Sequence, residues 1–160
     1  MGILYSRSIG TLLSKGEYIF PLDNDDLFLD EDVFKTISNI NDTNFQTHKP
    51  NLVLFQPELG KFPLKEGNTS ESIFNDVYLW AKCIKTSLYK EALIKIGAKR
   101  ISRYVLIFED IYVNYVLFNI ANSYKFINKY GLFRIKRKES ASNIWGKYNE
   151  MNKSFLYLLL

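Results

Sequence analysis

The sequence has 160 residues, of which 47% are hydrophobic and 16% aromatic, so it is too apolar to be disordered and suits one globular domain. Its 21 Lys and Arg residues against 17 Asp and Glu give a net charge of only +4, which gives little reason to expect nucleic acid or a membrane surface as a partner. A single cysteine, Cys83, excludes an internal disulfide framework and fits a reducing compartment such as the cytoplasm. No apolar run approaches the roughly 20 residues that a membrane-spanning helix needs.

The N-terminal part predicts two helices separated by a strand and an acidic turn. Residues 4–14 favour a short helix that ends near Gly16, a residue suited to the left-handed position after a helix. Residues 17–22 are rich in aromatic and β-branched side chains and predict a buried strand. The acidic residues 23–26 follow. Asp30 is then suited to cap a helix whose apolar stripe comprises Val33, Phe34, Ile37 and Ile40.

The rest of the chain continues the alternation of apolar strands and helices. Gly97 is placed to end a helix that begins at Thr86 or Ser87. The predicted elements in chain order are a strand at 52–55, a strand at 79–84, a helix at 86–96, a helix at 110–122, strands at 124–127 and 132–135 around Gly131, and a last amphipathic helix within 144–160. Such an alternation predicts one α/β domain over residues 1–160, in which helices flank a sheet.

An acidic cluster, Asp23-Asn24-Asp25-Asp26, comes directly after the first predicted strand. Its carboxylates repel one another, and a hard divalent cation such as Mg²⁺, Mn²⁺ or Ca²⁺ removes that repulsion. Ligands of open α/β sheets bind beyond the carboxyl ends of strands, which is where this cluster falls. A solvated turn before an acidic helix start explains the same residues equally well. A calcium EF-hand loop fits poorly, because Phe28 and Phe34 occupy the glycine and last-ligand positions.

Two further groups of charged residues are candidates for a site. Glu109 and Asp110 follow an apolar stretch at a predicted helix start. Acids at such a position are ordinarily caps or partners of the helix dipole, but a carboxylate at a strand–helix junction can also face a cleft and act as a general base. The basic residues Lys136, Arg137 and Lys138 are typical of a solvated strand edge or loop, and they could instead meet a diphosphate.

Residues 15–26, Lys-Gly-Glu-Tyr-Ile-Phe-Pro-Leu-Asp-Asn-Asp-Asp, resemble the segment of family-2 glycosyltransferases in which a strand leads to a D-x-D-D metal motif. Tyr5-Ser6-Arg7 resembles the helix before that strand, and Leu79-Trp80-Ala81-Lys82 resembles the strand before the acceptor-side helix. Phe108-Glu109-Asp110 resembles the "ED" motif of the family, and residues 130–142 resemble the region that closes the domain. The order and the spacing agree across most of the chain.

The resemblance implies an incomplete GT-A fold, a Rossmann-like mixed sheet flanked by helices. It also implies transfer of a sugar from a nucleotide-diphospho-sugar to a hydroxyl of a glycan, lipid or protein acceptor. Mn²⁺ or Mg²⁺ at Asp25 and Asp26 would bridge the diphosphate. Asp110 would serve as the base of an inverting transfer, with Glu109 supporting the site. Asp23 and the basic residues 136–138 would contact the donor.

Members of this family begin with a strand–helix–strand unit that holds the nucleotide, and no residues of this sequence correspond to it. We therefore expect the chain to be a C-terminal portion of the catalytic domain that shows little or no transfer by itself. An alternative of another class is a catalytically inactive remnant that acts as a binding module. Metal-dependent phosphoryl transfer would also use clustered aspartates, but the sequence has no glycine-rich phosphate loop.

Overall fold

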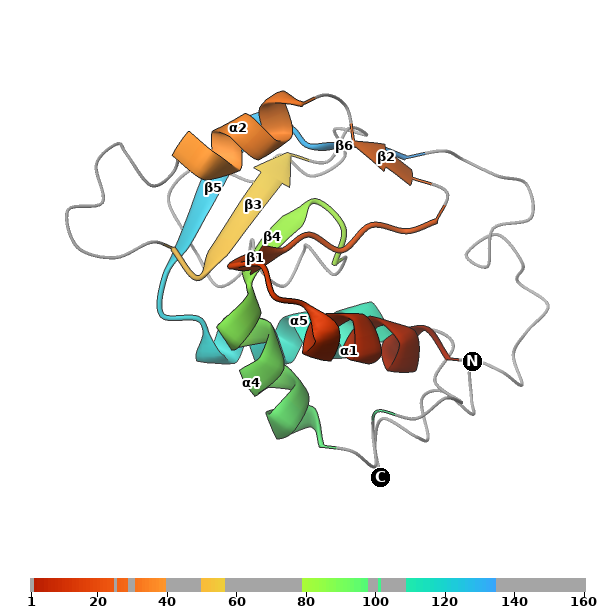
Figure 1. Ribbon diagram of the computed structural model, residues 1–160. Helices are drawn as coiled ribbons and strands as arrows, with labels where there is room; N and C mark the ends of the chain where they lie inside the picture. Colours follow the sequence, from red (N-terminus) through yellow and green to blue (C-terminus); the bar gives the residue numbers. More distant parts are fainter. Residues whose placement is uncertain are drawn as a thin grey trace.

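The described part of the chain is a mixed α/β structure. The computed structural model describes residues 2–24, 26–28, 31–39, 50–56, 79–97, 101 and 109–134. Within these residues, four helices lie on the two faces of a four-stranded sheet, and a second sheet of two strands lies beside it (Figure 1). This confirms the predicted α/β class with helices flanking a mixed sheet. The arrangement is compatible with an incomplete Rossmann-like fold.

The four-stranded sheet has the order β1 (Tyr18–Ile19), β4 (Lys82–Lys85), β3 (Leu52–Gln56) and β5 (Tyr124–Tyr130). Strands β3 and β5 are parallel, whereas β4 runs antiparallel to both of its neighbours, β1 and β3. Strands β1, β3 and β5 therefore point the same way, and their carboxyl ends share one edge of the sheet. The acidic residues after β1 leave the sheet at this edge.

The second sheet pairs β2 (Asp26–Phe28) with β6 (Leu132–Arg134) in antiparallel register. The two strands predicted around Gly131 are present, but they belong to different sheets, because β5 pairs with β3 and β6 pairs with β2. Gly131 lies between them, against the ring of Phe55 on β3. A Cβ at this position would be 3.0 Å from both Cβ and Cγ of Phe55, so a side chain here would require Phe55 to shift.

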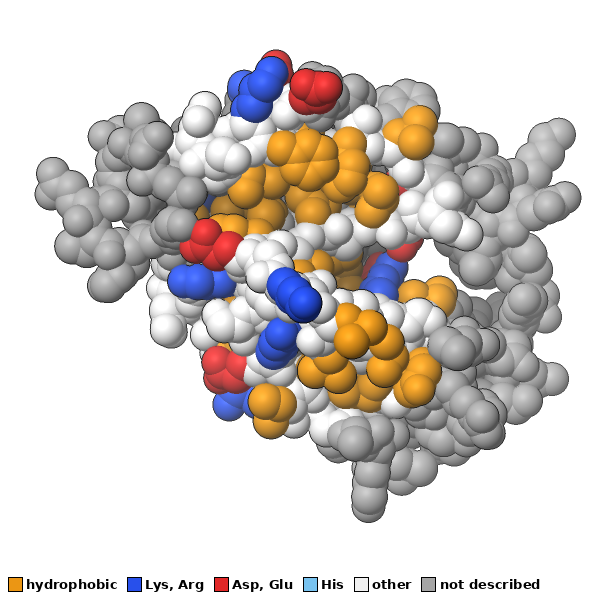
Figure 2. Space-filling model, viewed as in Figure 1, with side chains coloured by type: hydrophobic (Ala, Val, Ile, Leu, Met, Phe, Trp, Pro, Cys, Tyr) orange, Lys and Arg blue, Asp and Glu red, His pale blue; other side chains and the backbone are white. Residues whose placement is uncertain are grey.

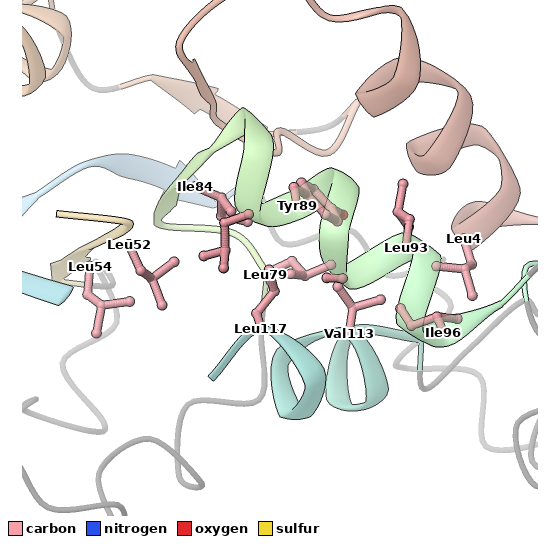
Figure 3. Packing of buried hydrophobic residues seen from close by; sticks show 12 residues of the cluster. Leu4, Leu52, Leu54, Leu79, Ile84, Tyr89, Leu93, Ile96, Val113 and Leu117 are labelled. Carbon is pink, nitrogen blue, oxygen red and sulfur yellow. The ribbon is translucent and has the colours of Figure 1, made fainter. Parts of the chain in front are cut away.

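The alternation of side chains along the strands divides the core into two layers. On β3, Leu52 and Leu54 pack against the helices of one face, whereas Val53 and Phe55 pack on the other face. Figure 3 shows the larger layer, which extends from Leu52 and Leu54 past Ile84, Leu79 and Leu117 to Leu93, Ile96 and Leu4. Its helical members include Leu4, Leu88, Tyr89, Ala92, Leu93, Ile96, Val113 and Leu117. Cys83 is buried in the smaller layer, as expected for a core residue.

Three helices, α1 (Ile3–Leu13), α4 (Thr86–Ile96) and α5 (Glu109–Ile120), cover one face of the sheet, and α2 (Asp32–Asn39) lies on the other (Figure 1). Gly97 adopts a positive φ of 81° and ends α4, as the sequence predicts. Helix α5 begins one residue before the predicted start and ends two residues before the predicted end.

Some details of the helix ends differ from the predictions. Ser14, in an extended conformation, follows α1, and Gly16 does not take the left-handed conformation expected of it. The hydroxyl of Thr86 makes no capping bond on α4 and donates instead to the carbonyl of Gly16. On α2, Val33 is buried and Phe34 is half exposed. The predicted cap Asp30 and the predicted helix within 144–160 lie outside the described residues.

Hydrophobic side chains also gather on the surface. Figure 2 shows one group over α1 and another beneath α2 on the same face of the molecule. The exposed apolar residues of α1 are Ile3, Ile9, Leu12 and Leu13. Helix α1 therefore packs one side on the core and presents a second apolar side to solvent. Within the described part of the chain, no helix is both long and apolar enough to cross a membrane.

Candidate functional site

Arg7, on α1, contacts carboxylates from two segments that are far apart in the sequence. Its Nη2 donates to Oδ1 of Asp23 at 2.6 Å. Its Nη1 donates to Oε1 of Glu109 at 2.8 Å and to Oδ1 of Asp110. One guanidinium thus joins the acidic cluster that follows β1 to the acidic pair that begins α5. We call these four residues the Arg7 cluster.

The Arg7 cluster is shielded from water on one side and open on the other. The side chains of Glu109 and Arg7 are 6% and 16% exposed, and that of Asp110 is 20% exposed. The side chain of Asp23 is 42% exposed. Because charges attract more strongly where water is excluded, these ion pairs hold the residues more firmly than pairs on an open surface do. Asp23 is thus the member of the cluster most accessible to solvent.

Burial changes the protonation of Glu109. Loss of water around the carboxyl group, together with the charge of Asp110, raises the pKa of Glu109 from 4.5 to about 8, although Arg7 acts in the opposite direction. Glu109 therefore holds a proton at neutral pH. For Arg7, burial acts to lower the pKa, but the charges of Asp110, Asp23 and Glu109 outweigh it and raise the pKa further. The guanidinium is permanently charged.

The position of Asp23 follows from the aromatic packing around the segment after β1. The ring of Phe20 contacts Phe28 edge-on, with centroids 5.0 Å apart, and Phe55 at 5.6 Å. A turn then closes with a hydrogen bond from the backbone N–H of Asp26 to the carbonyl of Asp23 at 3.1 Å. These contacts fix the backbone on both sides of Asp23, so its carboxylate is presented at the carboxyl end of β1.

The position of Arg7 follows from the packing of α1. Leu4, Ser8 and Thr11 are buried, and Arg7 lies beside them on the helix surface. The connection from α1 to β1 is fastened to α4. Thr86 Oγ1 donates to the carbonyl of Gly16 at 2.6 Å, and Lys90 Nζ donates to the carbonyl of Ser14 at 3.2 Å. These bonds hold the helix that carries Arg7 to the strand that leads to Asp23.

The other predicted site residues are distributed differently. Asp26 is buried at 6% exposure and begins β2 opposite Arg134. Asp25 and the basic residues Lys136, Arg137 and Lys138 lie outside the described residues. In the described ranges, no three acidic, histidine or cysteine side chains come close enough to hold a metal ion. The proposed metal ligands therefore stay a prediction.

Arg7 is a residue of the candidate site for which the sequence analysis predicts no role. A signal was nevertheless present, because Arg7 is spaced three and four residues from Leu4 and Thr11, both of which are buried. Charged side chains on a buried helix stripe are rare unless they are paired. An arginine at that spacing, in a chain with two acidic clusters, therefore indicates an ion pair, although not which acids form it.

A scan of protein-family models finds none that matches this chain, and a search of curated proteins finds no match. The functional argument therefore depends on the residues themselves. Two of the three motifs singled out in the sequence for their chemistry, the acidic cluster after β1 and the Glu109–Asp110 pair, meet at Arg7.

Proposed function

We propose that this chain carries catalytic residues of an inverting, metal-dependent glycosyltransferase, which moves a sugar from a nucleotide-diphospho-sugar to an acceptor hydroxyl. The observation that carries the proposal is the Arg7 bridge between Asp23 and the Glu109–Asp110 pair. A transfer site of this kind needs acids that hold a cation and a diphosphate, and it needs a base beside them. The bridge supports the proposal because it brings Asp23, which begins the segment of the proposed metal ligands, next to the proposed base Asp110.

The donor side would be formed by the acidic segment 23–26. Carboxylate oxygens are the ligands that Mg²⁺ and Mn²⁺ prefer, and one or two of them suffice when phosphate oxygens and waters complete the shell. Asp25 and Asp26 would hold the cation, which when bound neutralises the charge of the departing diphosphate. Asp23, the most exposed acid of the Arg7 cluster, would help to orient the donor. Lys136, Arg137 and Lys138 would contact the diphosphate.

The base would be Asp110 rather than Glu109. Glu109 is nearly fully buried, and its raised pKa, about 8, means that it already holds a proton at neutral pH. Asp110 is more exposed, and its Oδ1 is anchored on Arg7. Asp110 would accept the proton of the acceptor hydroxyl while that oxygen bonds to the anomeric carbon. The bond from this carbon to the diphosphate oxygen breaks on the opposite face, which inverts the configuration.

A second function deserves a test because Arg7 already engages the acids. With Asp23, Asp110 and the protonated Glu109 held by one guanidinium, the Arg7 cluster is partly neutralised by the protein itself. This favours a binding module that retains the shape of a transfer site without turnover. Such a module would bind a sugar nucleotide or a partner protein and would release no nucleoside diphosphate. In either case the buried free thiol of Cys83 suits a reducing, cytoplasmic setting.

Calorimetric titration with a panel of nucleotide-diphospho-sugars tests the donor site. We expect binding that requires Mn²⁺, disappears in EDTA and weakens in Asp25→Ala and Asp26→Ala. Asp32→Asn is the control, because Asp32 is an exposed acid on α2 that pairs with Lys35 at 3.3 Å. Binding that is equal with and without Mn²⁺, or unchanged in both alanine variants, would exclude the proposed donor site.

A further inference from the structure

We infer that Arg7 is a positioning residue, which holds Asp110 and Asp23 at a fixed distance and orientation across the site. The inference rests on the proposed function for the role of Asp110 as a base. The bridge itself, from α1 to both acidic segments, is a property of the described residues and can be tested without any substrate.

The contacts of Arg7 use the shape of the guanidinium as well as its charge. One terminal nitrogen, Nη1, serves the two acids of α5, and the other, Nη2, serves Asp23. The group is planar and presents its donors in a rigid fork, so that carboxylates bound to the two nitrogens are held in a set geometry. A lysine ammonium has a single nitrogen on a flexible stem and lacks such a fork.

Arg7 and Asp110 belong to the same packed layer of helices, whereas Asp23 does not. Arg7 belongs to a helix whose buried residues, Leu4, Ser8 and Thr11, face the layer formed with α4 and α5. Asp110 stands at the start of α5, in the same helical layer. Asp23 follows β1 and lies outside that layer. The bond from Nη2 to Asp23 therefore ties the segment after β1 to the helices that carry the proposed base.

Removal of the guanidinium should affect the acids of α5 and Asp23 differently. Glu109 and Asp110 are largely shielded from water and would lose their cation, while Asp23 is the more exposed partner and would be free to turn to solvent. For a transferase, a misplaced base lowers turnover more than it lowers donor affinity, because orientation matters most in the transition state. Arg7→Lys should therefore reduce kcat by a larger factor than it raises the KM for the donor.

The direct test is a triple-mutant cycle on unfolding stability. Asp23→Asn and Asp110→Asn are measured singly and together, first with Arg7 present and then in Arg7→Met and Arg7→Lys. Two residues that share one partner are energetically coupled, whereas independent sites are additive. The control is the cycle for Lys35 and Asp32, an exposed pair with side chains 67% and 65% accessible, for which we expect almost no coupling.

We expect Asp23 and Asp110 to be coupled when Arg7 is present and additive in both Arg7 variants. A nitrogen-15 spectrum of the arginine side chain gives a second readout. Nη1 and Nη2 of Arg7 should give separate signals, because contacts on both nitrogens block rotation of the group, and the signals should merge in Asp23→Asn. Additive effects in the wild type, or coupling that persists without the guanidinium, would overturn the inference. Coupling in a protein that binds no sugar nucleotide would instead refute only the proposed function.

Discussion

Arg7 Nη2 lies 2.6 Å from Asp23 Oδ1, so a side chain of the first helix reaches the acidic segment on the far side of β1. This contact gives Asp23 a partly buried cationic partner. Asp23 is the first acid of the cluster and the one that faces the Glu109–Asp110 pair through a shared cation. The chemistry proposed for this protein depends on that juxtaposition.

Glu109→Gln should change the dependence of stability on pH. The folded protein raises the pKa of Glu109 from 4.5 to about 8, so the native state holds a proton that the unfolded chain has already released. The contribution of Glu109 to the free energy of unfolding is at its full value below about pH 4.5. It is lost as the pH rises towards 8. Glutamine cannot titrate, so the variant should lose this part of the slope and become the more stable protein above pH 8.

Urea unfolding at several pH values measures this effect. Glu91→Gln is the matched control, since Glu91 is an exposed glutamate on α4. If Glu109→Gln and the wild type show the same slope between pH 5 and 8, then Glu109 does not hold the proton that we assign to it.

Gly131→Ala should destabilise the fold. The new methyl group would lie 3.0 Å from Cβ and Cγ of Phe55, so the buried Phe55 would have to shift. We expect a loss of about 1–3 kcal/mol in the free energy of unfolding, the usual cost of overpacking. Gly10→Ala is the control, because no atom lies within 4 Å of its added methyl group. In the middle of α1 that change should stabilise by about 0.5–1 kcal/mol. Equal effects of the two substitutions would contradict the close approach.

Leu117→Ala should loosen the helix that carries Asp110. Leu117 is fully buried between α5 and its neighbours, so its truncation should cost about 2–5 kcal/mol. Ile94→Ala on α4 is the control, because Ile94 is 79% exposed and its loss should stay within about 0.5 kcal/mol. Thermal or urea unfolding measures both. A small effect at Leu117 would show that α5 is not held by this core.

Much of the fold could be predicted from local patterns. The apolar spacing and the glycine stop gave α4 almost to the residue, and the alternation of strands and helices gave the fold class. Strand limits were less accurate, because pairing depends on distant partners. Residues 17–22 contain only a two-residue strand, and Pro21 within them has no N–H to continue a ladder. Strand β2 was not predicted, since its partner β6 is far along the chain.

The candidate site shows the same division. The acids at 23, 109 and 110 could be identified from their positions at the ends of apolar stretches, which is local information. Their partner could not be, because Arg7 pairs with residues 16, 102 and 103 positions away. Asp26, a predicted metal ligand, begins strand β2 and is buried, and the partner strand β6 lies far along the chain. Local sequence does not show which distant strand such a residue will pair with, or whether its side chain will be buried.

Turnover by Asp110→Asn, in this chain joined to the strand–helix–strand unit that the resemblance implies, tests the central claim most directly. Release of nucleoside diphosphate is measured with a sugar nucleotide that binds in the presence of Mn²⁺, and Glu109→Gln is the control that removes the neighbouring acid. Because a general base contributes about 10²–10⁴-fold to a rate, we predict that Asp110→Asn lowers kcat by that order, with donor affinity nearly unchanged and a smaller loss in Glu109→Gln. Full turnover by Asp110→Asn would contradict the role of Asp110 and the mechanism built on it.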